Sequence, residues 1–127
     1  MCPTRMAKLE SAIRIALAFN EAFNRHDIAG MMQLVGEDCI FEAAAPAPDG
    51  ALYSGKEAIS RYWQDFFRRT PHALIKVEEI FGFGNRCIMR WRYEGEDAAG
   101  LKGRVRGVDI IKEKDGAISE RLSYLKG

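Results

Sequence analysis

Several patterns that define common protein classes are missing from this chain. It has only three cysteines, Cys2, Cys39 and Cys87, and no Cys or His lies close to them at metal-ligand spacing. Neither a disulfide framework nor a metal site is therefore expected, and Cys39 and Cys87 are predicted to be small core residues. An excess of charge is missing too, because 19 Lys and Arg residues face 18 Asp and Glu residues. This balance argues against a nucleic-acid partner.

Long apolar runs are also absent. The two longest, residues 13–23 and 34–45, are short or interrupted by polar and charged residues, so neither predicts a membrane span. The opening segment MCPTRMAKLES has no apolar signal-peptide core, and we expect a cytoplasmic protein. With 127 residues, 47% of them hydrophobic, the chain predicts one globular domain over residues 1–127.

Helical periodicity dominates the beginning of the chain. Apolar residues recur every three or four positions over residues 9–24, which predicts a first helix. His26 lies in the corner that follows, and Asp27 is placed to cap a second, short helix. We interpret His26 as a surface or hinge residue beside this cap.

A short strand and a loop precede a third predicted helix. Residues 38–42 are expected to form the strand, and residues 43–55 form a loop rich in proline and glycine. Ser54 with Glu57 three positions later is a capping-box pattern. It opens a third helix with a broad apolar face.

In the second half of the chain, apolar residues recur at every second position instead of every three or four. This alternation predicts strands over residues 75–83, 87–93, 101–113 and 117–125, the last two joined at the Asp-Gly of 115–116. The element order is ααβαββββ, which is typical of an α+β domain with its helices on one face of the sheet.

One face of the predicted sheet is rich in arginine. Its members are Arg86, Arg90, Arg92, Arg104 and Arg106. Because Glu94 and Glu96 lie nearby, we predict cross-strand ion pairs on an outer sheet face that serves as a homodimer interface.

Four segments together resemble the NTF2-like superfamily, in particular its SnoaL-like and ketosteroid-isomerase-related members. They are NRHDIAGMMQLVGEDCIFE, YSGKEAISRYWQDFF, RWRYEG and VRGVDIIKEKDGAISERLSYLKG. The resemblance covers nearly the whole chain. It implies a cone-shaped fold in which a curved, mixed or antiparallel sheet wraps around three helices and encloses a largely apolar pocket. It also implies a dimer through the outer sheet face and chemistry without a cofactor.

The steroid isomerases of this superfamily use three diagnostic residues: a general-base Asp, and a Tyr with a protonated Asp that bind the oxyanion. The resemblance aligns the Tyr position with Phe19 and the base position with Ala43, so only the third position, Asp109, keeps its chemistry. A donor without a base does not move a proton from carbon, and the isomerase mechanism is not expected.

Two other chemistries of the superfamily make different demands on the sequence. The Asp-Arg-Asp arrangement of the limonene-epoxide-hydrolase-like members is not matched, because residues 90–92 are Arg-Trp-Arg and Ser123 lies near the final acid. SnoaL-like cyclases need a single pocket carboxylate, and Asp109 would meet that requirement.

Strand parity places Asp109 on the inward face with Val105 and Ile111. A two-residue hairpin loop would set Asp109 opposite Leu122, and a bulged loop would set it opposite Arg121. Without a cationic partner, desolvation would favour the neutral acid, which then serves as an acid or base near neutral pH. The alternative is a structural carboxylate in a salt bridge with an arginine.

Other residues complete the predicted site. The predicted ligand-binding side chains are Phe19, Tyr53, Trp63, Phe67, Trp91, Tyr93 and Tyr124. Asp49, in the 43–55 loop, and Glu42, at the end of the 38–42 strand, are candidates for a second acid. The alternatives are a turn-forming role for Asp49 and a rim salt bridge for Glu42.

The leading hypothesis is cofactor-free proton transfer on an apolar carbonyl compound, in an isomerisation, cyclisation or hydration, with Asp109 as the acid and base. A second hypothesis is a non-catalytic ligand-binding protein. A third is a dimerisation or partner-docking module.

Overall fold

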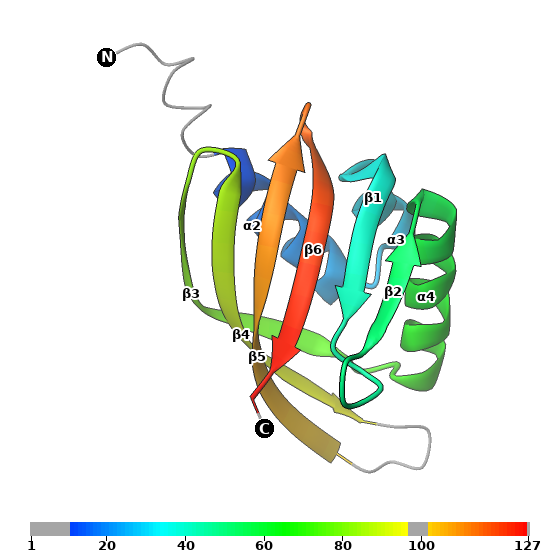
Figure 1. The fold of residues 1–127 in the computed structure, drawn as a ribbon. Helices are drawn as coiled ribbons and strands as arrows, with labels where there is room; N and C mark the ends of the chain where they lie inside the picture. The colour runs from blue at the N-terminus through cyan, green and yellow to red at the C-terminus, as the bar shows by residue number, and fades with distance from the viewer. Residues whose placement is uncertain (1–10, 97–101, 127) are drawn as a thin grey trace.

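The computed structural model describes residues 11–96 and 102–126, and every structural statement below refers to them (Figure 1). The elements in chain order are α2 (Ser11–Asn24), α3 (Ile28–Gln33), β1 (Val35–Ala43), β2 (Ala51–Ser54), α4 (Lys56–Arg69), β3 (Leu74–Phe83), β4 (Arg86–Glu96), β5 (Lys102–Lys114) and β6 (Ala117–Leu125). Residues 9 and 10 of the predicted first helix and residue 101 of a predicted strand lie outside the described part. None of the described helices is long and apolar enough to cross a membrane.

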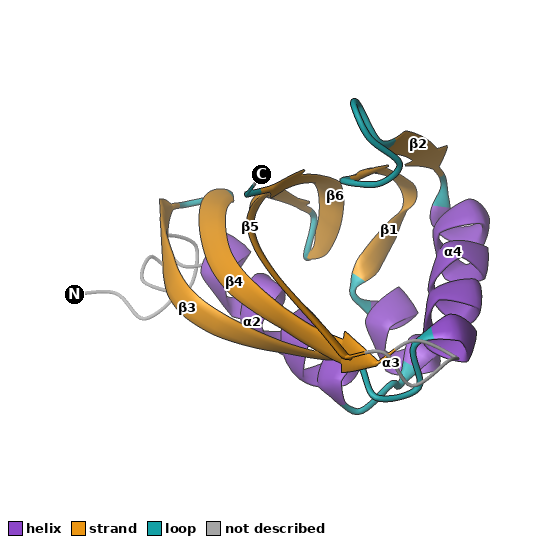
Figure 2. Cartoon of the chain, turned by 90° about the horizontal axis from the view of Figure 1, so that it is seen from below, coloured by secondary structure: helices purple, strands orange, loops and turns teal. Residues whose placement is uncertain are grey.

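The strands form one sheet in the order β2-β1-β6-β5-β4-β3. The β1–β6 pair is parallel and the other pairs are antiparallel, so the sheet is mixed. β3, β4 and β5 bend strongly around α2, while α3 and α4 lie toward β1 and β2 (Figure 2). β3 carries a bulge at Glu78, and a bulge increases the bend and twist of a strand. The predicted α+β class and cone-shaped fold are confirmed.

The first two helices are fixed by side-chain hydrogen bonds to the backbone. The Asp27 carboxylate accepts a hydrogen bond from the Gly30 N–H at 3.0 Å, which confirms the predicted cap of α3. At the end of α2, the Asn24 side chain donates to the Ile75 carbonyl at 2.9 Å and accepts from the Ile75 N–H at 2.8 Å. These two bonds attach α2 to the beginning of β3.

The predicted capping box at Ser54 is wrong. Ser54 belongs to β2, a strand that the sequence did not predict, where it pairs with Ile40 of β1. The chain turns into α4 at Gly55, whose φ of 91° lies in the left-handed region that glycine adopts most readily. No side chain caps α4, because Ser54 is held in extended backbone by its strand pairing.

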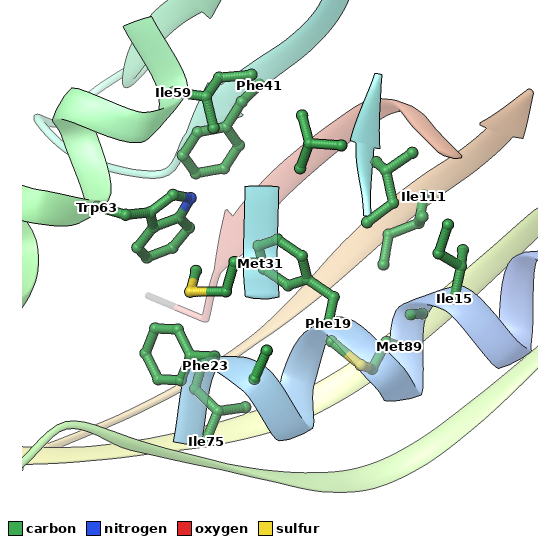
Figure 3. Close-up of a cluster of buried hydrophobic side chains, with 14 of the residues drawn as sticks. Ile15, Phe19, Phe23, Met31, Phe41, Ile59, Trp63, Ile75, Met89 and Ile111 are labelled. Atoms are coloured by element: carbon green, nitrogen blue, oxygen red, sulfur yellow. The ribbon is translucent and has the colours of Figure 1, made fainter. Parts of the chain in front are cut away.

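The core lies between the concave face of the sheet and the helices. Phe19 and Phe23 of α2 meet Trp63 of α4, and the Phe23 and Trp63 rings pack edge to face at 5.5 Å between centres (Figure 3). Such aromatic pairs add to the free energy gained by burying apolar area. Cys39 and Cys87 are buried, as predicted.

The β5–β6 hairpin decides which side chains of β6 point inward. Its turn is the predicted two-residue one, with Lys114 opposite Ala117. Ser119 is then left unpaired in a bulge, since Glu113 pairs with Ile118 while Lys112 pairs with Glu120.

The bulge places Ser123 opposite Asp109. Neither register expected from the sequence, with Leu122 or with Arg121 opposite Asp109, is the observed one. Because the extra residue reverses the alternation of faces, Arg121 is buried on the concave side and Tyr124 is exposed on the outer side.

Candidate functional site

Asp109 and Arg121 form an ion pair inside the domain. Asp109 is 0% exposed and Arg121 is 6% exposed. The Arg121 Nε donates to Asp109 Oδ2 at 2.8 Å, and Arg121 Nη2 lies 2.6 Å from the same oxygen. The Ser123 hydroxyl donates to Asp109 Oδ1 at 2.6 Å. Both carboxylate oxygens are therefore occupied by short, charge-assisted or hydroxyl hydrogen bonds.

Aromatic rings surround the guanidinium of Arg121. Its Cζ lies 5.0 Å from the centre of the Phe19 ring, 5.4 Å from that of Phe41 and 5.5 Å from that of Trp63. The faces of aromatic rings attract cations, so this arrangement partly compensates for the loss of water around the charge. Figure 3 shows how these three rings come together from α2, β1 and α4.

A cavity of about 200 Å³ lies beside the ion pair. Its walls are Phe23, Phe41, Ala44, Ala45, Tyr62, Trp63, Phe66, Ile75, Trp91, Tyr93, Val105, Arg121, Ser123 and Leu125. Apolar and aromatic groups dominate, and polar atoms come from a few side chains only. This composition is typical of small-molecule sites in proteins.

Two residues of the cavity wall carry buried N–H donors without a hydrogen-bond partner. They are Trp91, through Nε1, and Arg121, through Nη1. Arg92 Nε also lacks a hydrogen bond, but it lies 3.3 Å from a carboxylate oxygen of Glu94. Among the buried side chains of the described residues, every unpartnered atom is thus a donor and none is an acceptor.

Two tyrosines of the cavity wall and the two buried cysteines of the core are held in their neutral forms. Burial raises the pKa of Tyr62 and that of Tyr93 above the ordinary tyrosine value. Burial likewise raises the pKa of the Cys39 thiol and of the Cys87 thiol to about 11. Near neutral pH these four groups therefore remain protonated, and none is a ready base or nucleophile.

The SnoaL-like domain family matches residues 16–121, a span that includes most of the core and the Asp109–Arg121 pair. The chain belongs to the SnoaL-like family. An NTF2-like protein of unknown function from Mesorhizobium loti is 37% identical, with 94% of each chain covered and a TM-score of 0.79. Among curated proteins, none matches this chain significantly.

Two more distant structures share the fold of this SnoaL-like domain. A putative polyketide cyclase from Xanthomonas campestris pv. campestris is 20% identical over 94% of this chain and 93% of its own, with a TM-score of 0.84. A Mycobacterium tuberculosis protein, solved in complex with estradiol-17β-hemisuccinate, is 22% identical over 91% of this chain and 94% of its own, with a TM-score of 0.81.

Three of the predicted ligand-binding residues of the SnoaL-like domain, Trp63, Trp91 and Tyr93, line the cavity. Phe19 and Phe67 are buried and lie outside its wall. They belong to the core, where Phe19 packs under the Arg121 guanidinium and Phe67 stacks on His26 with 4.3 Å between ring centres. Tyr53 stacks on Phe41, behind the wall, and its side chain is half-buried.

The placement predicted for Tyr124 is wrong. The sequence prediction put Tyr124 on the face of Asp109, but its side chain is 47% exposed in a groove of the outer face beside Arg90 and Arg106. The cause is the bulge at Ser119, which turns Ser123 inward and Tyr124 outward.

The two candidates for a second acid do not reach the cavity wall. Asp49 is exposed in the loop between β1 and β2. Glu42 is half-buried and lies on the outer side of β1, between the buried Phe41 and Ala43. The beginning of the loop nevertheless contributes Ala44 and Ala45 to the wall.

Sequence reasoning placed Asp109 correctly on the inward face and left a salt bridge with an arginine open, but it did not predict the hydrogen bond from Ser123. Asp109 itself is not part of the cavity wall; Arg121 and Ser123 are. The loop length alone gave no signal for this pair, because an unpaired Ser119 is needed to bring both side chains inward. No group of three or more His, Cys, Asp or Glu side chains within residues 11–96 and 102–126 is arranged to hold a metal ion.

Proposed function

We propose that this SnoaL-like domain binds a small, largely apolar molecule in the cavity beside Arg121. The observation that carries the proposal is the cavity wall, in which aromatic side chains surround a small number of polar groups. A solved structure of the same fold, in complex with estradiol-17β-hemisuccinate, adds support for a ligand of this kind.

The structure favours ligand binding over a reaction in which Asp109 itself acts as the general base. The carboxylate has no exposed surface, and both of its oxygens already accept hydrogen bonds. A general base must come within about 3 Å of the proton that it removes, directly or through one water. Within the described residues, the cavity wall holds no carboxylate, imidazole or thiol that would take over this role.

A catalytic alternative rests on Ser123, which belongs to the cavity wall and donates to Asp109. In this alternative, the Ser123 oxygen accepts a proton from the α-carbon of a carbonyl substrate while its own proton passes to Asp109. Arg121 would stabilise the negative oxygen that develops. The putative polyketide cyclase of the same fold favours this class of reaction. If turnover of a carbonyl substrate is found, S123A and D109N should each abolish it while the substrate still binds.

Ligand binding can be tested with a variant that fills the cavity. Val105 lies on the cavity wall, whereas Leu52 is 63% exposed on the outer face. V105W is expected to block titration with naphthalene-2-methanol, followed by the fluorescence of Trp63 and Trp91 and by calorimetry. L52W adds the same ring away from the cavity and is expected to bind as the wild type does. Equal binding by both variants would refute the cavity as the site.

We also propose that the outer sheet face forms a homodimer. An apolar row crosses this face at paired positions of neighbouring strands: Phe81, Ile88, Ile110 and Leu122. Ion pairs flank the row, including Arg90 with Glu79 at 3.5 Å and Arg106 with Glu78 at 2.9 Å. Both signs of charge on one face suit a self-complementary contact.

The dimer proposal is tested by light scattering after size exclusion. I88E puts a charge into the apolar row and is expected to give a monomer. L17E changes an exposed leucine of α2, away from this face, and should leave the mass unchanged. A wild-type monomer at high micromolar concentration would contradict the proposal.

A further inference from the structure

The buried polar atoms of the cavity wall that lack a hydrogen-bond partner are both donors, and this indicates which kind of ligand would fit. Trp91 Nε1 and Arg121 Nη1 are buried donors without partners, while no buried side-chain acceptor of the described residues is left unpaired. A buried donor is costly unless something accepts its hydrogen. A ligand that supplies hydrogen-bond acceptors would therefore satisfy these two donors.

Charge around the cavity points in the same direction. Arg121 carries one positive charge, which Asp109 balances. Arg69, at the end of α4, adds a second positive charge that acts on the two wall tyrosines, Tyr62 and Tyr93, and lowers the pKa of each against the larger effect of burial. Among the described residues Arg69 forms no ion pair. Because both tyrosines remain neutral near pH 7, these five side chains together give the cavity a net charge of about +1.

We infer that the ligand of this cavity is an apolar carboxylate, with its head group bound by Arg121 Nη1 and Trp91 Nε1. A carboxylate accepts hydrogen bonds and donates none, and its two oxygens suit two separate donors. Its charge also balances the excess positive charge that Arg69 adds near the wall tyrosines. This inference rests on the proposed ligand-binding function and specifies its ligand class.

The head group reaches Arg121 by displacing an aromatic ring. Nη1 has almost no accessible surface, and the rings of Phe19, Phe41 and Trp63 lie around the guanidinium. Phe41 and Trp63 also belong to the cavity wall. A carboxylate that replaces one ring face therefore changes the surroundings of Trp63. A neutral ligand of the same shape gains less from contact with the guanidinium and is expected to leave these rings in place.

Three probes with the same ring system test the inference: naphthalene-2-carboxylate, 2-acetylnaphthalene and naphthalene-2-methanol. Calorimetry at pH 7.5 and low salt is expected to give the carboxylate a dissociation constant at least about tenfold lower than that of the alcohol. The carboxylate should also produce the larger change in tryptophan fluorescence. If the ketone or the alcohol binds as tightly as the carboxylate, the inference is wrong and the proposed apolar site stands. If none of the three binds, the proposed function fails with it.

Three variants distinguish the contribution of each hydrogen-bond donor to carboxylate binding from that of the overall positive charge. W91F keeps an aromatic ring but removes Nε1, and it should weaken carboxylate binding by about fivefold with little change for the alcohol. R69Q removes an exposed charge and is expected to weaken the carboxylate by about two- to threefold, less so at high salt. D109N/R121Q removes both charges of the pair, so that neither is left buried alone, and it should abolish the preference for the carboxylate. A preference that survives in D109N/R121Q would overturn the role of Arg121.

Discussion

Removing one member of the Asp109–Arg121 pair should destabilise the domain far more than removing both. Both residues are almost completely buried, and their side chains meet at 2.6 to 2.8 Å. A single substitution leaves one uncompensated charge in the interior, which typically costs about 3–5 kcal/mol. Small domains are stable by only about 5–15 kcal/mol. We therefore expect D109N and R121M each to lose about 3–5 kcal/mol of unfolding free energy.

The double variant D109L/R121M replaces the pair with apolar side chains of similar length. Replacement of a buried pair in this way is often neutral or stabilising by about 1–4 kcal/mol. Its stability should therefore exceed that of both single variants. The coupling free energy from the four proteins is expected to be at least about 3 kcal/mol.

The assay is urea unfolding, followed in parallel by far-UV circular dichroism and by the fluorescence of the buried Trp63 and Trp91. A matched control is the i,i+4 pair of Glu57 and Arg61 on α4, whose side chains are 81% and 74% exposed. E57Q should cost less than about 0.5 kcal/mol. If D109N also costs less than about 1 kcal/mol, or if the double variant is as unstable as the worse single variant, the reasoning is refuted.

Three further predictions concern packing, hydrogen bonding and pH. A Cβ at Gly107 would clash with the backbone carbonyl of Tyr124 and lie 2.7 Å from the Trp91 ring, so G107A should cost about 1–3 kcal/mol and shift the fluorescence of Trp91. An unchanged melting temperature would contradict this close packing. Asn24 makes two hydrogen bonds to the backbone of β3, and N24A should cost about 1–3 kcal/mol in urea unfolding, with N24D recovering only the accepted bond. The pKa of Cys39 and of Cys87 is raised from 9.0 to about 11, so the folded state keeps protons that the unfolded state releases above pH 9. The unfolding free energy should therefore fall between pH 9 and 11, and the fall should be shallower in the C39A/C87A variant.

The fold could be predicted from the sequence because local patterns and global structure agree. The helical period over residues 9–24, the alternation over 87–93 and the Asp-Gly turn at 115–116 each give a clear signal, and each element is found within the described residues. β2 was missed because a four-residue strand lies inside a loop rich in proline and glycine. Its pairing with β1, rather than its own residues, makes it a strand.

The candidate site was predictable only in part. The inward face of Asp109 follows from parity along β5, which is regular through this residue. The partner of Asp109 depends on a second strand, where the register shifts by one at Ser119. Serine has no strong preference for a bulge, so the local sequence does not mark the shift. The sequence left two readings of Asp109 open for this reason, a carboxylate without a cationic partner and a salt bridge with an arginine, and the salt bridge is the one observed.

The unpaired Ser119 also affects how relatives of this domain should be compared. Beyond it, β6 turns Arg121 and Ser123 toward the cavity and Leu122 and Tyr124 toward the outside. In a relative that pairs the same strand without this extra residue, the residues at the positions of Leu122 and Tyr124 would point inward and those at the positions of Arg121 and Ser123 would point outward. That part of the cavity wall would then be apolar, and the outer face of the strand would be charged. A single insertion or deletion in this hairpin thus changes both the side chains that meet the ligand and those on the outer surface. The percentage of identical residues in an alignment does not record this change.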